Sequence, residues 1–132
     1  MFTMPLTLIP RHTHISGSSE VLARGPPSFE EEVVVNIREA QEMMKRIYYE
    51  RDKARGIERT ILRTYQELGE LSDAVLRGED QSAIVSEMAD VFAWVCSVAN
   101  LLGVDLGDAL LSKYANVCSK CGKSPCECVD TP

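Results

Sequence analysis

Residues 57–76 read IERTILRTYQELGELSDAVL, and residues 81–102 read QSAIVSEMADVFAWVCSVANLL. Apolar residues recur in both stretches every three or four positions, which is the period of an amphipathic helix. Gly78 stops the first helix, and Asp80 or Ser82 caps the second, which ends at Gly103. Because the linker between the two helices is short, we expect them to run antiparallel and side by side.

A further helix is expected before this pair. Ser28 followed by Glu31 fits a capping box, in which the two side chains satisfy the first backbone N–H groups. Apolar residues then continue at helical spacing. We expect this helix from about Phe29 to about Lys53, ending near Gly56.

A fourth helix is expected after Gly103, with Asp105 as its N-cap and its end near Val117, where the cysteines begin. No segment alternates apolar and polar residues as a strand does. The sequence therefore predicts an all-α fold, an antiparallel four-helix bundle with a short Cys-rich C-terminal tail. The expected parts are a flexible N-terminal segment, a helical catalytic domain and a metal-binding tail, at residues 1–27, 28–117 and 118–132.

The apolar stripe of each helix is expected to face the core of the bundle. On the central pair of helices these stripes are Ile61, Tyr65, Leu68, Ser72 and Val75, and Ile84, Met88, Val91, Val95, Ala99 and Leu102.

The composition argues against several classes of protein. The 20 acidic residues outnumber the 14 basic ones and give a net charge of −6, which argues against binding to a nucleic-acid polymer. The sequence shows no long uninterrupted apolar run and no signal peptide, so no membrane span is expected. We therefore expect a cytoplasmic protein that does not bind membranes.

Four carboxylates stand in two i, i+3 pairs, Glu67 with Glu70 and Glu87 with Asp90. Each pair projects from one side of its helix, and the pairs can face each other because their helices are antiparallel neighbours. A divalent cation would offset the repulsion among the four acids, and hard oxygen ligands favour Mg²⁺ or Mn²⁺. The alternative is a solvated acidic helix face, and the spacing alone does not decide between the two.

The stretches Gln66-Glu67-Leu68-Gly69-Glu70-Leu71 and Glu87-Met88-Ala89-Asp90 resemble the E-E-x-x-E and E-x-x-D halves of the MazG-like nucleotide pyrophosphohydrolase signature. The resemblance extends over about residues 28–116. It implies an all-α fold, often dimeric or higher, that cleaves an NTP or dNTP between the α and β phosphates. It also implies that Glu67, Glu70, Glu87 and Asp90 are the catalytic metal ligands. Gln66 departs from the signature, which has a Glu at this position.

The resemblance and the need for cations near the phosphates supply candidate substrate-binding residues. Lys113 and Asn116 match a Lys-x-x-Asn element of related proteins, and Arg55 is a further candidate for the phosphates. Trp94 could stack on a nucleobase. The alternative for each of the basic side chains is that it is a solvated surface residue. The alternative for Trp94 is that its ring packs in the core.

Four cysteines crowd into the tail, at Cys118, Cys121, Cys126 and Cys128. A Gly after the second and a Pro before the third would let the loop wrap a tetrahedral Zn²⁺, which we expect to be structural. Disulfides and an iron–sulfur cluster are the alternatives.

The leading functional hypothesis is a Mg²⁺-dependent hydrolase that converts an NTP or dNTP to its monophosphate and pyrophosphate, with nucleotide-pool cleaning as its role. One alternative is a phosphoribosyl-ATP or dCTP-type pyrophosphatase of the same superfamily. Another, from a different class, is a non-catalytic zinc-bearing helical module that binds a protein partner. We expect a homodimer or homotetramer, because a bundle of this size often completes its pocket with a partner chain.

Overall fold

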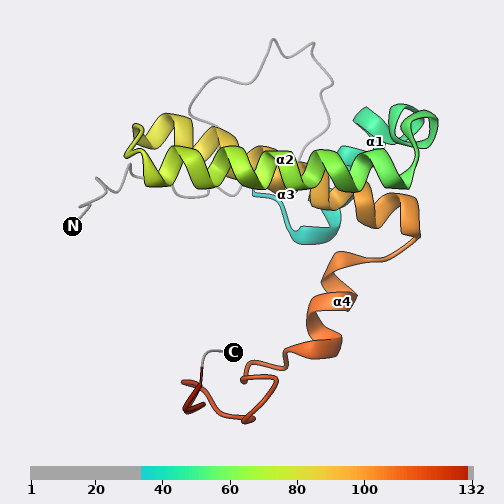
Figure 1. Cartoon of the computed structure of the whole chain (residues 1–132). Helices are drawn as coiled ribbons and strands as arrows, with labels where there is room; N and C mark the ends of the chain where they lie inside the picture. Colours follow the sequence, from blue (N-terminus) through green and yellow to red (C-terminus); the bar gives the residue numbers. More distant parts are fainter. Residues whose placement is uncertain (1–33, 131–132) are drawn as a thin grey trace, which may run out of the picture. The chain divides into compact units, whose positions relative to one another are not determined.

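The computed structural model describes residues 34–130, which hold four helices and no strand. These helices are α1 (Ile37–Arg55), α2 (Ile57–Leu76), α3 (Gln81–Leu102) and α4 (Leu106–Lys113). The all-α fold class predicted from the sequence is confirmed. α2 and α3 lie side by side, α1 packs mainly against α3, and α4 contacts α1 (Figure 1). Backbone contacts group the described residues from Asn36 onward into one compact unit.

The first helix begins later than the sequence suggests. Residues 34–36 are not helical, and Asn36 caps α1. The Asn36 side chain accepts a hydrogen bond from the backbone N–H of Glu39 at 2.9 Å, and the Glu39 carboxylate accepts one from the N–H of Asn36 at 3.3 Å. This is a capping box, and it starts the helix where a polar acceptor follows three β-branched valines in the sequence. The capping box expected at Ser28 and Glu31 lies outside the described residues.

The fourth helix ends earlier than expected, at Lys113 instead of near Val117. Tyr114 is extended, with φ −123° and ψ 109°, and Asn116 has φ 61°. Asn tolerates this left-handed conformation better than most residues because its short side chain can bond locally. The backbone therefore turns at residues 114–116 and leads directly into the cysteine segment.

A buried pair of amides fixes the turn between α3 and α4. The Gln41 side chain donates to the Asn100 side chain at 3.1 Å and to the carbonyl of Val104 at 2.7 Å. It also accepts from the backbone N–H of Leu106 at 2.9 Å. Because each polar atom of Gln41 is satisfied, this contact holds the start of α4 against α1 without an unpaired buried group.

The buried face of α2 is not the one that its apolar stripe predicts. The residues of α2 that are buried are Thr60, Glu67 and Ala74, which lie seven positions apart. Among the described residues, the only buried hydrophobic side chains are the small ones of Ala74, Cys96 and Ala99. The expected core residues that are instead exposed on α2 and α3 are Ile61, Tyr65, Leu68, Val75, Met88, Val95 and Leu102.

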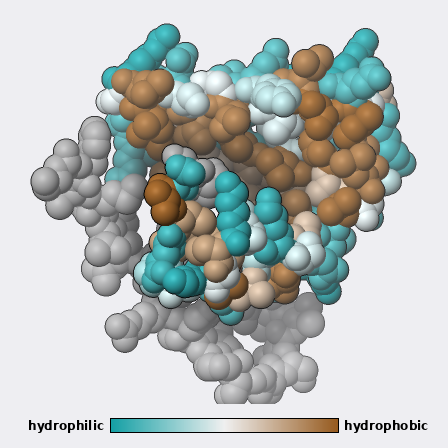
Figure 2. Space-filling model, turned by 60° about the horizontal axis from the view of Figure 1, so that its bottom comes forward, coloured by the Kyte–Doolittle hydropathy of each residue, from teal (hydrophilic) through white to brown (hydrophobic). Residues whose placement is uncertain are grey.

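This reversal has a simple physical reason. Small and polar side chains let α2 approach α3 closely and turn Glu67 toward it, which leaves the larger apolar residues on the outside. Figure 2 shows a broad band of apolar residues across one face of the molecule. An exposed apolar surface of this kind marks an interaction site in most soluble proteins.

α3 is long and apolar enough to cross a membrane by length and composition, with a mean hydropathy of 1.4 over its best window. This match rests on length and composition only, so the expectation that the chain has no membrane span stays a prediction. α3 also carries Glu87 and Asp90 in its first half and packs against α1 and α2. Carboxylates at such positions are costly in a bilayer, and a helix of the bundle accounts for the same composition.

Candidate metal and substrate sites

Three of the four candidate acids converge between α2 and α3. Glu67, Glu70 and Glu87 each offer a carboxylate oxygen, and these three oxygens lie within 4.8 Å of one another. Glu67 is buried, Glu87 is half-buried and Glu70 is exposed. Glu67 reaches this position because it occupies the buried face of α2 together with Thr60 and Ala74.

The electrostatics of the cluster fit a bound cation. Burial raises the pKa of Glu67 and of Glu87, and the nearby charges of Glu70 and Asp90 raise both further. The Oε2 atom of Glu87 is buried and has no hydrogen-bond partner among the described residues. A carboxylate oxygen in this state is costly unless a cation or donor reaches it. Oxygen ligands of this kind suit Mg²⁺ or Mn²⁺.

Asp90 faces a cavity of about 170 Å³ next to this cluster. The cavity lies between α1 and α3, and its lining also includes Trp94, Arg55 and Asp52. Asp52 is only 1% exposed; its Oδ1 atom accepts a hydrogen bond from Arg55 at 2.9 Å, and its Oδ2 atom has no partner among the described residues. Asp52 is not among the site residues predicted from the sequence, because a helix-end acid gives no signal of its burial.

Two guanidinium groups lie close to the ring of Trp94. Arg55 lies 4.5 Å from the centre of the Trp94 ring, and Arg63 lies 5.4 Å from it. Both distances are within the range of cation–π attraction. The structure thus brings Trp94 and Arg55, two of the predicted substrate-binding residues, into one cavity beside Asp90.

Arg63 is a candidate residue that the sequence reasoning missed. Its guanidinium donates to the Oε1 atom of Glu67 at 2.6 Å and to the Oε1 atom of Gln66 at 2.7 Å. The i, i+4 spacing from Arg63 to Glu67 could have indicated the pair, but such pairs are common on solvated helices. The burial of Glu67 distinguishes this pair from the others.

Lys113 and Asn116 are not among the residues that line the cavity beside Asp90. Lys113 is the last residue of α4, and its ammonium group lies 5.6 Å from the ring centre of Tyr114. Asn116 lines a different, open cavity next to Cys118 and Cys126. The structure therefore does not bring this pair together with the acids as it does Arg55 and Trp94.

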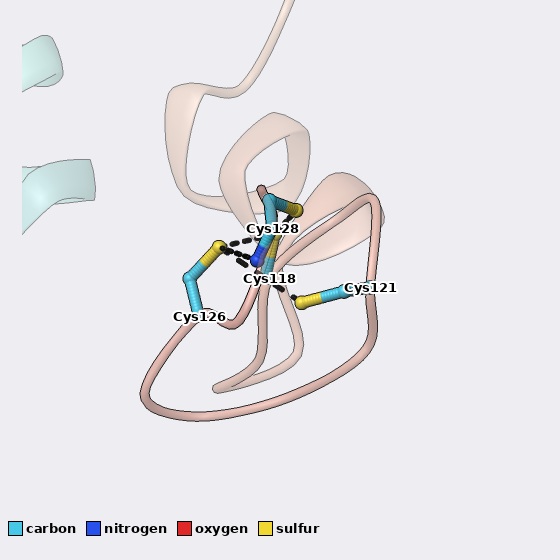
Figure 3. A group of neighbouring side chains, drawn as sticks. All are labelled: Cys118, Cys121, Cys126 and Cys128. Carbon is cyan, nitrogen blue, oxygen red and sulfur yellow. Dashed lines mark hydrogen bonds between the residues drawn. The ribbon is translucent and has the colours of Figure 1, made fainter. Parts of the chain in front are cut away.

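The four cysteines of the tail form a second cluster, and Figure 3 shows their side chains gathered within one loop. Their sulfur atoms all lie within 4.8 Å of one another. Cys118 is 3.4 Å from Cys126 and 3.8 Å from Cys128, and Cys121 is 3.9 Å from Cys126. Four sulfurs at about 2.3 Å from a zinc ion would form a tetrahedron with edges of about 3.8 Å.

The backbone around these cysteines favours thiolates. Backbone N–H groups of Cys121 and Lys120 lower the pKa of Cys118 to about 6. The N–H groups of Glu127 and Lys123 lower the pKa of Cys121, whereas the neighbouring sulfurs raise that of Cys128 to about 11. All four cysteines are free thiols in the structure, so the cluster offers four sulfur ligands and not two disulfides. Zinc and iron both accept such a set.

A family model, the MazG nucleotide pyrophosphohydrolase domain, matches residues 55–122, just over half of the chain. The chain belongs to this family. The match to the MazG domain includes both acid pairs on α2 and α3, and it ends within the cysteine segment, after Cys121. No curated protein matches the chain significantly.

The acid cluster predicts how the stability of this MazG domain depends on pH and metal. The pKa values of Glu67 and Glu87 are raised above 4.5, so charging these groups costs more in the folded chain than in the unfolded one. Their contribution to stability is complete below about pH 4.5 and is lost as the pH rises through their folded pKa values. Mg²⁺ binds the charged form, so it should raise the melting temperature by several degrees at pH 8 and by much less at pH 5.

Thermal unfolding in EDTA and in Mg²⁺ at the two pH values measures this difference. Ca²⁺-free buffers and equal ionic strength keep general salt effects the same in both. An equal gain in melting temperature at pH 5 and pH 8 would contradict the assignment of the raised pKa values to metal ligands.

Proposed function

We propose that this MazG domain is a Mg²⁺-dependent pyrophosphohydrolase that converts an NTP or dNTP to its monophosphate and pyrophosphate. The convergence of Glu67, Glu70 and Glu87, with a buried and unpartnered oxygen on Glu87, is the observation that carries the proposal. Asp90 completes the proposed ligand set from the cavity side of α3. A metal would offset the repulsion between a triphosphate and the acid cluster of this acidic chain.

The reaction adds water across the anhydride between the α and β phosphates. The water oxygen bonds to the α phosphorus while the bond from this phosphorus to the bridging oxygen breaks, and pyrophosphate leaves. The proton of the water passes to a carboxylate of the cluster or to solvent. When bound, the metal supplies neutralisation of the phosphate charge and a more acidic water.

The cavity beside Asp90 supports a site for the nucleoside. Trp94 offers a flat apolar surface for a base, and Arg55 supplies a positive charge within the same cavity. The unpartnered Oδ2 atom of Asp52 is an acceptor that an amino group of a base could satisfy. Lys113 and Asn116 remain candidates on the strength of the family resemblance alone.

Pyrophosphate release from a panel of canonical and damaged NTPs and dNTPs, with Mg²⁺ and with EDTA, tests this function. The proposal expects metal-dependent release of pyrophosphate and of the matching monophosphate, and the ranking of substrates tests a role in nucleotide-pool cleaning. Release of orthophosphate instead of pyrophosphate would show that the enzyme cleaves a different phosphate bond. No release by folded, Mg²⁺-loaded protein would favour the zinc-bearing binding module.

We also propose that the tail binds one structural Zn²⁺ through Cys118, Cys121, Cys126 and Cys128. The sulfur separations and the backbone N–H groups aimed at Cys118 and Cys121 support a preformed tetrahedral site. Its role would be to order a segment that is too short to bury a core of its own.

The zinc assignment predicts one zinc ion per chain by elemental analysis. Replacing both Cys118 and Cys128 by Ser should abolish zinc binding and lower the melting temperature, because the tail loses its only cross-link. The control is Cys96→Ala, which changes a buried cysteine outside the cluster and should keep the zinc. Iron in place of zinc, or two disulfides in the purified protein, would overturn the assignment.

A second copy of the chain is the proposed partner. The described residues bury no large hydrophobic side chain of α2 or α3 completely, which is unusual for a domain that folds alone. Most of the large apolar residues exposed on the two helices follow a 4-3 spacing, which is the pattern of helices that pack against other helices. These residues are Ile61, Tyr65, Leu68 and Val75 on α2, and Val85, Met88, Phe92, Val95 and Leu102 on α3.

A further inference from the structure

We propose that Arg63 is a phosphate-binding residue, which Glu67 and Gln66 hold until a divalent cation binds. This inference rests on the proposed pyrophosphohydrolase function and names a residue that binds the departing pyrophosphate. The starting observation is that the Arg63 guanidinium makes two short contacts along α2, 2.6 Å to Glu67 and 2.7 Å to Gln66.

The position of Arg63 is that of a counter-ion to the acid cluster. Its side chain is 44% exposed, whereas that of Glu67 is only 7% exposed. Arg63 therefore reaches in from solvent and neutralises one oxygen of a buried carboxylate, and it lowers the pKa of Glu67 against the larger effects of burial and Glu70. The remaining charges of the cluster, on Glu70 and Glu87, receive no such partner from Arg63.

A divalent cation among the three carboxylates would weaken this contact for two reasons. It would share the charge of Glu67, and it would repel the guanidinium at close range. The side chain of Arg63 is long and half-exposed, so its guanidinium group can turn away without disturbing the packing of α2 against α3.

Gln66 makes the release of Arg63 easier. The MazG-like signature has a Glu at this position, and a carboxylate there would hold the guanidinium by a second charge-assisted bond. The neutral amide of Gln66 offers a weaker acceptor. Among the described residues, Glu67 is therefore the one acidic group that retains Arg63.

The surface next to Arg63 suits a phosphate group. Arg55, Arg59 and Arg63 line one shallow depression together with Leu62 and Gln66. Three guanidinium groups gather here on a chain whose net charge is −6. Arg55 and Arg63 also flank Trp94, so the depression adjoins the cavity proposed for the nucleoside. A guanidinium group can donate two parallel hydrogen bonds to two oxygens of one phosphate. The terminal phosphate of pyrophosphate offers such a pair of oxygens.

The variant Arg63→Gln tests the inference through two binding measurements that do not need turnover. Electron paramagnetic resonance measures Mn²⁺ binding in the absence of nucleotide. The Mn²⁺ affinity of the variant should be about threefold to tenfold higher, because a competing positive charge is gone. Calorimetry measures the binding of inorganic pyrophosphate to the Mn²⁺-loaded protein, and this affinity should fall about tenfold or more. With an active protein, KM for the triphosphate should rise in parallel.

Two further variants keep the test decisive. Arg77→Gln removes an exposed arginine that pairs with Asp73 on the same helix, and it should change neither affinity. Arg63→Lys keeps the charge but loses the paired contact, so it should leave Mn²⁺ affinity near that of the unchanged protein and still weaken pyrophosphate binding. It also serves if Arg63→Gln does not fold.

The sign of the Mn²⁺ effect separates this role from a structural one. If Arg63 only orients Glu67, Arg63→Gln should bind Mn²⁺ more weakly, and that result would overturn the proposal. Unchanged pyrophosphate affinity in both Arg63 variants would also overturn it. A protein that binds Mn²⁺ and pyrophosphate as expected but hydrolyses no nucleotide would leave the role of Arg63 intact and refute the proposed function instead.

Discussion

The variant Glu87→Gln is expected to lower the rate of pyrophosphate release by about a thousandfold and to leave the protein folded. The change keeps the shape of the side chain but removes the charge of a carboxylate whose Oε2 atom is buried without a partner. Loss of the metal removes several kcal/mol of transition-state stabilisation, which corresponds to about three orders of magnitude in rate. Steady-state pyrophosphate release at saturating Mg²⁺ measures the effect.

The same variant should be more stable than the unchanged protein in EDTA. Burial, and after it the nearby charges of Glu70 and Asp90, raise the pKa of Glu87, so its ionised form is disfavoured in the metal-free chain. Removing that charge should raise the melting temperature in EDTA and abolish the further rise with Mg²⁺. A damaged fold would instead lower the melting temperature under both conditions.

Asp73→Asn is the matched control for Glu87→Gln. Asp73 is an exposed acid on α2, it pairs with Arg77 at 3.4 Å, and it lies outside the cluster of three carboxylates. Its amide variant should keep pyrophosphate release and the response to Mg²⁺. Full activity in Glu87→Gln would remove the acid cluster from the proposed mechanism.

The double variant Leu68→Glu, Phe92→Glu is expected to convert the assembly to single chains. Leu68 and Phe92 are 49% and 43% exposed on α2 and α3, within the apolar stripes proposed to meet a second copy. A charge buried in such an interface costs several kcal/mol, and a symmetric contact would contain each change twice. Light scattering should give at least twice 14.7 kDa for the unchanged chain and 14.7 kDa for the variant.

Leu111→Glu is the control for this pair of changes. Leu111 is 69% exposed on α4, outside the stripes of α2 and α3, and its change to Glu should leave the assembly intact. A mass of 14.7 kDa for the unchanged chain would contradict the proposed partner. Loss of assembly in Leu111→Glu would move the interface to α4.

The helices are the part of the fold that local sequence signals predict best. The expected bounds of α2 and α3 match the structure, because Gly78, Asp80 and Gly103 supply stop and cap signals that act within one turn. α1 and α4 were each expected to be longer. At those ends more than one residue could cap the helix. α1 begins after the N-cap Asn36, and α4 ends where the backbone becomes extended at Tyr114.

Some features of the candidate site could also be predicted from local sequence patterns, and others could not. The i, i+3 pairs indicated which acids share a helix face, and the structure brings Glu67, Glu70 and Glu87 together. The contacts of Asp52 and Arg63 could not be predicted, because each depends on which face of its helix is buried. Lys113 and Asn116 are not among the residues that line the cavity beside Asp90, because motif spacing alone does not fix where α4 lies relative to α1 and α3.

The amino-acid sequence alone was enough to predict the helical period, the glycine and N-cap boundaries, the pairing of the acids and the clustering of the cysteines. Each of these properties depends on residues a few positions apart, where backbone geometry fixes the relation. Only the tertiary structure decided that α2 turns Thr60, Glu67 and Ala74 toward α3 and leaves its apolar stripe outside. An apolar stripe is attracted equally by any apolar surface, so periodicity alone does not distinguish the core of one chain from an interface between two.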